Sequence, residues 1–284
     1  MELTDLKVFV TVAEEGNISG AAQRMDYVQS NVTARIRKLE SELGVPLFHR
    51  HPKGVSLTDK GVVFREYAAS IVQMSDEAVR AVQDTPYPSG PLCIGVVDTL
   101  NCGSLMRALS SFQSRHPEVS LTLLTGPSGD LLDMVLSHKL DGAFVTGDYP
   151  PAKLLCEHAT RDELRLLTPL TGDEYPDLAA LKWAVSPKGC PFRAILEQWL
   201  QSIGLALDNI IEISSLETLL SCVRAGLAST LLPASVLNGD DGTIGVYPVP
   251  EPFRYTKTSL VRRNDRFTSK AFTVFAEMVK ASGM

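Results

Sequence analysis

The sequence from Asn17 to Gly61, which decides the fold, reads NISGAAQRMDYVQSNVTARIRKLESELGVPLFHRHPKGVSLTDKG. Its apolar spacing predicts two short helices joined by a tight turn, with a small extension after them. A protein that places a helix in the major groove of DNA needs this arrangement. The stretch therefore indicates the class of the protein, its partner and its mechanism together.

The segment before this stretch predicts a supporting helix. Apolar residues recur at helical spacing from Leu3 to Ala13, so we expect an amphipathic helix over residues 3 to 15. Gly16 stands where a left-handed cap residue belongs, and Asn17 or Ser19 is able to cap the next helix.

A third helix, expected from about Ser30 to Leu43, is unusual in what it exposes. Its apolar residues form one stripe, so polar and basic residues occupy the rest of its surface. Taken alone, such a surface is usually an ordinary solvated face, but the adjoining helix favours DNA contact. The candidate base contacts are Gln29, Ser30, Asn31 and Thr33, and the candidate phosphate contacts are Arg35 and Arg37.

The extension from Phe48 to Gly61 predicts a small wing. Arg50 and Lys53 lie in or beside its turn, where they are able to reach the minor groove or the DNA backbone. The alternative is a charged hairpin without DNA contacts.

These features closely resemble the LysR-type transcriptional regulators. The matching segments are the helix from Ser19 to Met25, Gln29, the run from Ile36 to Glu40, the block from Leu43 to Phe48, and the run from Gly54 to Thr58 before Gly61. The rest of the chain agrees with this family in length and layout. Two departures, Val28 and Ala34, replace a capping serine and a basic residue that many members carry.

The resemblance implies the partners and the architecture. We expect an N-terminal winged helix-turn-helix, a long linker helix, and a two-lobed α/β regulatory domain resembling periplasmic binding proteins. The expected partners are double-stranded DNA at a promoter operator, a small-molecule effector, RNA polymerase, and further copies of the chain in a homodimer or homotetramer.

Composition agrees with this class once the position of the charges is considered. The net charge of −6 argues mildly against a nucleic-acid partner. However, cations cluster between Arg35 and Arg65, and local charge governs phosphate contact. The N-terminus lacks a signal-peptide core, and no apolar run reaches membrane-spanning length, so we expect a cytoplasmic protein without a membrane partner.

No motif indicates a metal, a cofactor or a catalytic centre. The five cysteines lack Cys-x-x-Cys spacing and the five histidines are scattered, so a zinc site is not expected. The chain also lacks a Gly-x-Ser-x-Gly elbow, a phosphate loop and a dinucleotide fingerprint. We therefore predict a protein that is not an enzyme and that has no cofactor.

The segment after the wing predicts a dimerising linker. We place the DNA-binding domain at residues 1–58, a linker helix with heptad spacing at 59–84, and a proline-rich hinge at 85–91. The helix needs a partner for its apolar stripe, and the resemblance implies antiparallel pairing with a second subunit. The alternative is that it packs on its own domain.

Residues 92–284 alternate strands with helices, which predicts a largely parallel sheet covered by helices. The expected lobes are lobe I, at about 92–161 and 263–284, and lobe II, at about 162–262. Ligands in such sheets bind beyond the C-terminal ends of strands, near helix N-termini.

This rule selects a group of candidate effector contacts. The family pocket lies at the positions that match Thr99, Gly126, Ser186 and Thr230, and Cys190 and Arg193 stand nearby in the sequence. Hydroxyl groups, helix termini and one cation suit a small carboxylate or another anion. For each serine or threonine taken singly, the alternative is an ordinary helix cap.

A redox-responsive regulator is the alternative function. Cys190 stands at a predicted strand-to-helix turn, and its next partner in sequence is Cys222. The peroxide-sensing members of the family carry two cysteines close together there, and this chain lacks that pair.

Overall fold

The computed structural model describes residues 1–82, 87–100, 102–170, 174–237, 242–264 and 267–282. Two units divide the chain: the first holds Met1–Asp84 with Ser137–Lys139, and the second holds Thr85–Leu136 with Leu140–Met284. Among the described residues, no helix is both long and apolar enough to cross a membrane.

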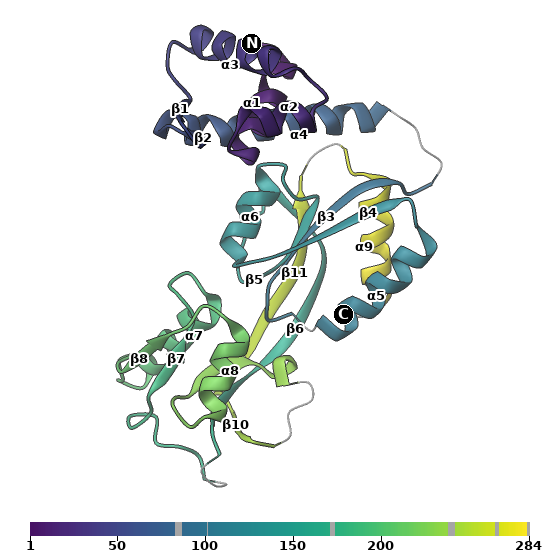
Figure 1. Cartoon of the computed structure of the whole chain (residues 1–284). Coiled ribbons are helices and arrows are strands. Elements are labelled where there is room, and N and C mark those ends of the chain that lie inside the picture. The colour runs from purple at the N-terminus through teal and green to yellow at the C-terminus, as the bar shows by residue number, and fades with distance from the viewer. Residues whose placement is uncertain (83–86, 101, 171–173, 238–241, 265–266, 283–284) are drawn as a thin grey trace. The chain divides into compact units, whose positions relative to one another are not determined.

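Three helices and a hairpin form the start of the first unit (Figure 1). The caps follow the sequence: Gly16 ends the first helix in the left-handed conformation, with φ of 65°, and Asn17 caps the second by accepting from the Gly20 amide. The elements are α1 (Leu3–Glu15), α2 (Ile18–Arg24), α3 (Gln29–Leu43), β1 (Phe48–His51) and β2 (Gly54–Leu57).

One apolar core holds these elements together. The ring of Phe9 in α1 lies 5.2 Å from that of Phe48 in β1 and 5.1 Å from that of Phe64 in the following helix, α4 (Asp59–Val82). Ala21 and Ala22 are buried in the same core, as expected where two helices approach closely. The core therefore fixes α2 and α3 on α1 and leaves the opposite surface of α3 in solvent.

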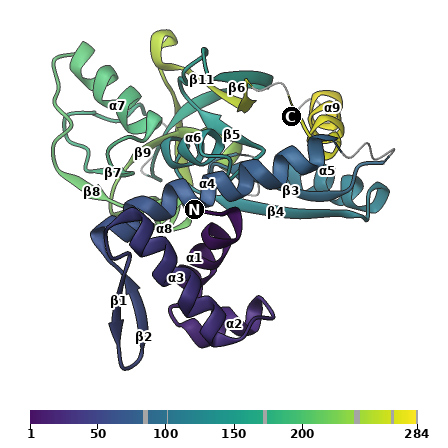
Figure 2. The ribbon, with the colours of Figure 1, turned by 90° about the horizontal axis from the view of Figure 1, so that it is seen from above.

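A two-residue loop joins β1 to β2, and the hairpin that these strands form extends away from the helices (Figure 2). Its base is fixed because the Val55 amide donates to the Gly16 carbonyl oxygen over 2.8 Å. A Cβ at Gly54, whose φ is 142°, would overlap that carbonyl oxygen. The expected wing is present, and its tip is exposed.

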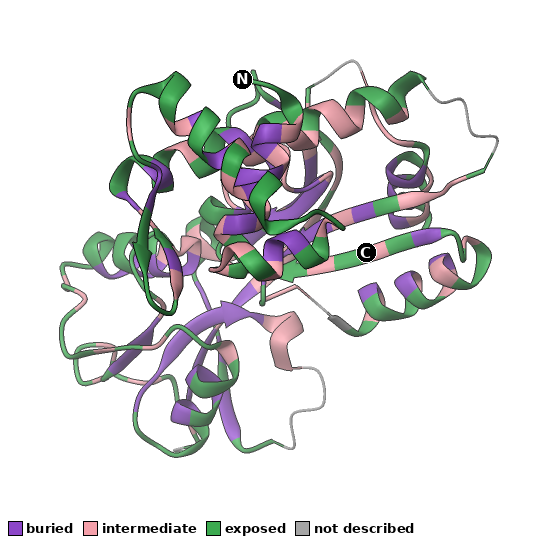
Figure 3. Ribbon diagram, turned by 45° about the horizontal axis from the view of Figure 1, so that its top comes forward, coloured by how far each residue is buried: buried purple, intermediate pink, exposed green. Residues whose placement is uncertain are grey.

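Helix α4 (Asp59–Val82) follows the wing, and the Thr58 hydroxyl accepts from the Gly61 amide at its start. Phe64 and Ala68 pack into the core of the first unit, so part of the predicted seam packs within the chain. Only Gly61 and Ala68 are buried in this helix, and Figure 3 distinguishes such residues from exposed ones. Its exposed apolar residues are Val62, Val63, Tyr67, Ile71, Met74, Val79 and Val82.

The predicted end of the linker helix and part of the predicted hinge lie outside the described residues, at 83–86. Gly90 and Pro91, placed in the hinge from sequence, instead open strand β3 (Gly90–Val96). The Gly90 amide donates to the Glu118 carbonyl oxygen, which draws this segment into the sheet.

The second unit is built on a seven-stranded mixed sheet, with the order β10-β6-β11-β5-β3-β4 and β9 beside β6. Among the described strands of this sheet, only β3 pairs in parallel, with β4 and β5, and the other four pairings are antiparallel. The prediction of a largely parallel sheet is therefore wrong, because the long strand β11 runs antiparallel to both of its neighbours, β5 and β6. The remaining strands are β4 (Val119–Thr125), β5 (Gly142–Thr146), β6 (Leu154–Pro169), β9 (Thr230–Pro233), β10 (Ile244–Pro248), β11 (Tyr255–Arg263) and the separate pair β7 (Trp183–Val185) and β8 (Ile210–Glu212).

The two-lobed arrangement is visible in the separation of the cores. In one lobe, α5 and α9 cover one face of β3 and α6 covers the other (Figure 1). The other lobe has its own core around Trp183 and Trp199. The helical elements are α5 (Cys102–Arg115), α6 (Ser128–Leu136), α7 (Pro191–Ser202), α8 (Leu216–Arg224) and α9 (Lys270–Ser282), with short 3-10 turns at Ala234–Leu237 and Glu251–Phe253.

Candidate functional site

The first turn of α3 presents the candidate base contacts. Gln29, Ser30 and Asn31 are exposed, and Thr33 is half-buried with its hydroxyl donated to the Gln29 carbonyl oxygen over 2.9 Å. Val28 at the N-cap supplies no side-chain hydrogen bond. The first amides of α3 are therefore left uncapped by side chains, as an approaching phosphate requires.

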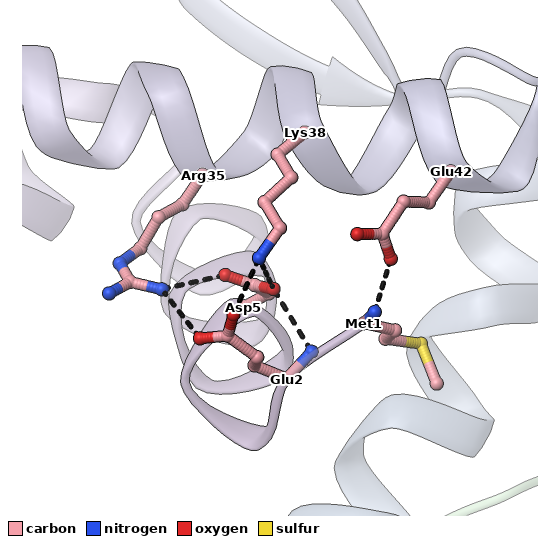
Figure 4. A network of polar contacts seen from close by, with 6 residues as sticks. All are labelled: Met1, Glu2, Asp5, Arg35, Lys38 and Glu42. Atoms are coloured by element: carbon pink, nitrogen blue, oxygen red, sulfur yellow. Dashed lines mark hydrogen bonds and ion pairs between the residues drawn. The ribbon is translucent and has the colours of Figure 1, made fainter.

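Arg35 is directed toward α1 rather than toward solvent (Figure 4). Its Nη1 donates to Oδ1 of Asp5 over 2.7 Å, and Asp5 is fully buried. Burial alone raises the pKa of Asp5, but hydrogen bonds from the Glu2 amide and Arg35, with the charge of Lys38, lower it below its ordinary value. The assignment of Arg35 to phosphate therefore competes with an ion pair inside the protein.

Lys38 is held by the same acidic segment (Figure 4). Its Nζ lies 2.6 Å from Glu2 Oε1 and 3.5 Å from Asp5 Oδ2. One turn further along α3, Glu42 pairs with the Met1 amine. Arg37 projects elsewhere, is exposed, and has no ion-pair partner among the residues that the structure describes.

The wing carries two exposed cations, as predicted. Arg50 lies in the exposed run of β1, and Lys53 stands in the loop. Neither forms an ion pair within the described part of the chain, so both are available to an external anion.

A cavity of about 410 Å³ lies in the second unit at the ends of several strands. It brings together four of the six predicted effector residues, which are Thr99, Gly126, Ser186 and Cys190. They come from the segments after β3, β4 and β7, so the rule that ligands bind beyond strand ends selects the same place.

Three helices begin at the wall of this cavity. Ser128, Pro191 and Leu216 line it and open α6, α7 and α8. Cys190, the N-cap of α7, supplies no side-chain cap. Ser215 does cap α8 by accepting from the Thr218 amide over 3.4 Å. The uncapped start of α7 is therefore the more open of these two anion-attracting termini.

Arg193 does not line this cavity, and its side chain is only 7% exposed. Its guanidinium donates to Glu212 over 2.7 Å, to Glu197 over 3.1 Å and to the Ser186 carbonyl oxygen over 3.2 Å. Arg193 therefore supports the turn that carries Ser186, rather than presenting a cation to the cavity.

Thr230 is also absent from the wall of this cavity. Thr230 is the first residue of β9 and does not follow the end of a strand. The expectation that it stands beyond a strand end is therefore wrong. Its side chain is buried at 2% exposure, because the antiparallel pairing of β9 with β6 encloses it.

Sequence reasoning missed several residues of the wall. Thr146 ends β5 at the same edge, and its hydroxyl lies 2.9 Å from that of Thr258. Because Thr146 stands at the C-terminal end of its strand, the rule that selected Thr99 and Gly126 applies to it as well. Asn101 follows the first strand, β3, in the sequence and is a candidate by the same rule, but it lies outside the described residues. The other missed polar or charged wall residues are Ser128, Asp130 and Lys188.

The two cysteines considered for a redox switch differ in environment. Cys190 is half-buried at the cavity, whereas Cys222 is buried in the core of its lobe. Neither Cys190 nor Cys222 forms a disulfide. This arrangement gives the redox alternative no specific support.

Each of the two units matches a known protein family. The model described as "Bacterial regulatory helix-turn-helix protein, lysR family" matches residues 3–62, and the model described as "LysR substrate binding domain" matches residues 86–283. The chain is 38% identical to the HTH-type transcriptional regulator SoxR of Arthrobacter sp. (strain TE1826), over 99% of this chain and 97% of that protein. It is 39% identical to YusT of Bacillus subtilis (strain 168), over 98% and 95% of the two chains.

Two solved structures share the fold. A full-length variant of OxyR from Pseudomonas aeruginosa has a TM-score of 0.72 at 23% identity, covering 99% of this chain and 95% of that one. Full-length CbnR complexed with its target DNA has a TM-score of 0.70 at 23% identity, covering 99% and 100%. The helix-turn-helix, the wing and the two-lobed unit with its cavity, together with these matches, establish that the chain belongs to the LysR family of bacterial transcriptional regulators.

Proposed function

We propose that this regulator binds a promoter operator through α3 and the wing. The main support is the first turn of α3, which is exposed and is not capped by a side chain. Two exposed cations of the wing, without ion-pair partners among the described residues, add to it. Gln29, Ser30 and Asn31 read base edges, whereas Arg37, Arg50 and Lys53 contact phosphate or the minor groove. CbnR, which shares the fold, has been solved with its target DNA, and this supports the proposal.

A second copy of the chain completes the DNA-binding form. The exposed apolar residues of α4 lie beyond those that pack on α1, so the helix has a further face for a partner. A two-fold dimer through this face presents two recognition helices to paired half-sites. The dimer, or a tetramer built from two dimers, acts in the cytoplasm on transcription by RNA polymerase.

The cavity in the second unit holds the effector. Its acidic group lies at the helix N-termini near Ser128 and Cys190, where Lys188 supplies a cation. Asp98 and Asp130 line the same cavity and accept hydrogen bonds from donors elsewhere on the ligand. Binding favours one arrangement of the regulator over another and so changes its output, without chemical conversion of the ligand.

Two substitutions test the DNA contacts. A duplex is first selected from a random pool by the wild-type protein, and affinity is then measured against salt. Lys53→Ala should weaken binding to all sequences and reduce the salt slope by about one, whereas Gln29→Ala should relax discrimination at one base pair. Uniform loss of affinity in both variants would contradict the contact assignment, and failure to select any duplex would contradict DNA binding.

Thermal unfolding of the full-length protein tests the effector site. The panel contains carboxylates, amino acids, aromatic acids and phosphates. A ligand at a hundred times its dissociation constant should stabilise the second unit by about 2.7 kcal/mol. Ser186→Ala, inside the cavity, should reduce the shift, whereas Ser221→Ala, on the outer face of α8, serves as the matched control. Equal shifts in both variants would place the ligand elsewhere.

A further inference from the structure

We propose that the N-terminal acidic segment of α1 controls the DNA affinity of the recognition helix by masking Lys38 with Glu2. The inference rests on the proposed DNA binding by α3. It identifies Glu2 as a residue that tunes this binding without touching DNA itself, and it separates the three cations of α3 into one that is available and two that are occupied.

The geometry places Lys38 beside the base-reading surface. Asn31 and Lys38 are seven residues apart, which is close to two full turns, so they project from the same side of α3. Lys38 is 44% exposed in its side chain and is therefore within reach of solvent and of a phosphate. Its position alone would predict a phosphate contact.

The ammonium group nevertheless has a partner already. Glu2 Oε1 lies 2.6 Å from Lys38 Nζ, and the Glu2 side chain is 60% exposed. A phosphate that approaches Lys38 must displace this carboxylate, and it then lies beside an unpaired negative charge. The net favourable free energy of this exchange is smaller than that of a phosphate contact with an unpaired lysine, because one ion pair is lost as another forms.

Asp5 holds the ion pair between Glu2 and Lys38 in position. Its carboxylate accepts from Arg35 over 2.7 Å and from the Glu2 amide over 3.0 Å, so it fixes the start of α1 against α3. Because Asp5 is fully buried, Arg35 cannot leave it without stranding a charge in the core. Asp5 and Arg35 are therefore positioning residues, and Glu2 is the adjustable member of the network (Figure 4).

The test compares Glu2→Gln with wild type in the full-length protein on the selected duplex. Glutamine keeps the size of the side chain but removes its charge. Lys38 then loses its nearest partner and keeps only the longer, 3.5 Å contact with Asp5 Oδ2, an oxygen that already accepts from the amide of residue 2. The plot of log K against log salt should steepen by about 0.9, the contribution of one additional phosphate contact. Affinity at low salt should rise by about two- to fivefold, the range expected for an exposed ion pair.

Glu14→Gln is the matched control. It makes the same charge change on the same helix, but it unpairs no cation of α3, and Arg24 keeps its second partner, Glu15, at 3.1 Å. Its salt slope should equal that of wild type. Equal slopes for Glu2→Gln and Glu14→Gln would overturn the proposal.

Lys38→Ala assigns the effect to one cation. In the wild-type background, this substitution should leave the salt slope unchanged, whereas in the Glu2→Gln background it should remove the entire gain. A slope reduced by about 0.9 in the wild-type background would show that Lys38 already contacts phosphate and would overturn the mask. A gain that persists in the double variant would also overturn it. Failure of wild-type DNA binding would instead reject the underlying function, and the two failures are therefore distinguishable.

Discussion

Arg35 in the first unit and Arg193 in the second occupy equivalent situations in two unrelated sites. Each follows a helix N-terminus in a candidate binding surface, and each is tied to carboxylates of the protein itself. In both regions a different cation remains exposed, Arg37 on α3 and Lys188 at the cavity. A cation in a binding motif is therefore available to a ligand only if the fold provides no internal partner.

The strongest way to break this comparison is to remove the buried partner of Arg35. Asp5→Asn keeps the shape of the side chain but removes the buried anion that lies 2.7 Å from the Arg35 guanidinium, and only the more exposed Glu2, at 3.7 Å, remains. We expect a loss of about 2–4 kcal/mol in the stability of the first unit. Hydrogen exchange of amides in α1 and α3, measured in the full-length protein, reports this loss. An unchanged exchange rate would show that Arg35 is not held by Asp5.

The same variant has a defined dependence on pH. The pKa of Asp5 is lowered in the folded protein, so its ionised form stabilises the fold. This contribution is present above the ordinary pKa of about 3.8 and is lost as the pH falls through the lower folded-state pKa. The difference between Asp5→Asn and wild type should therefore be constant near neutral pH and should shrink below about pH 4.

The internal pairing also explains which parts of the molecule were predictable from sequence. Helices α1 and α3 were predicted within one residue at each end, because local spacing and Gly16 determine them. Asp5 and Arg35 are 30 residues apart, and no local pattern joins them.

The sheet was less predictable for a similar reason. Strand β6 was missed because only its ends carry buried residues, and its middle, around Glu157 to Asp162, alternates between exposed and half-buried positions. Its pairing with β11 joins segments about a hundred residues apart, and this antiparallel contact makes the sheet mixed. At the cavity, Thr99, Gly126 and Ser186, which follow strands, were found from sequence. Thr230 and Arg193 required the tertiary structure to place them.

A smaller effect sharpens the comparison at the cavity. Lys188→Met should weaken binding of the acid with the largest thermal shift by about tenfold, because it removes the exposed cation of the wall. Arg193→Lys should change this affinity by less than about twofold, because that side chain lies outside the wall. Isothermal titration of both variants with the same acid measures the difference. A larger loss for Arg193→Lys would restore Arg193 as the effector contact.

The smallest predicted effect concerns Arg37, the cation of α3 that has no ion-pair partner among the described residues. Ser30 and Arg37 are seven residues apart and share the outer side of the helix, so Arg37 has direct access to the DNA that Ser30 contacts. Arg37→Ala should reduce the salt slope by about 0.9. Over a fourfold rise in salt, the ratio of the wild-type affinity to that of the variant should therefore fall by about three- to fourfold. Lys38→Ala is the control, since it removes the same charge one residue further along, and its slope should remain that of wild type. The reverse result would mean that the carboxylates of α1 do not decide which cations of the recognition helix reach DNA.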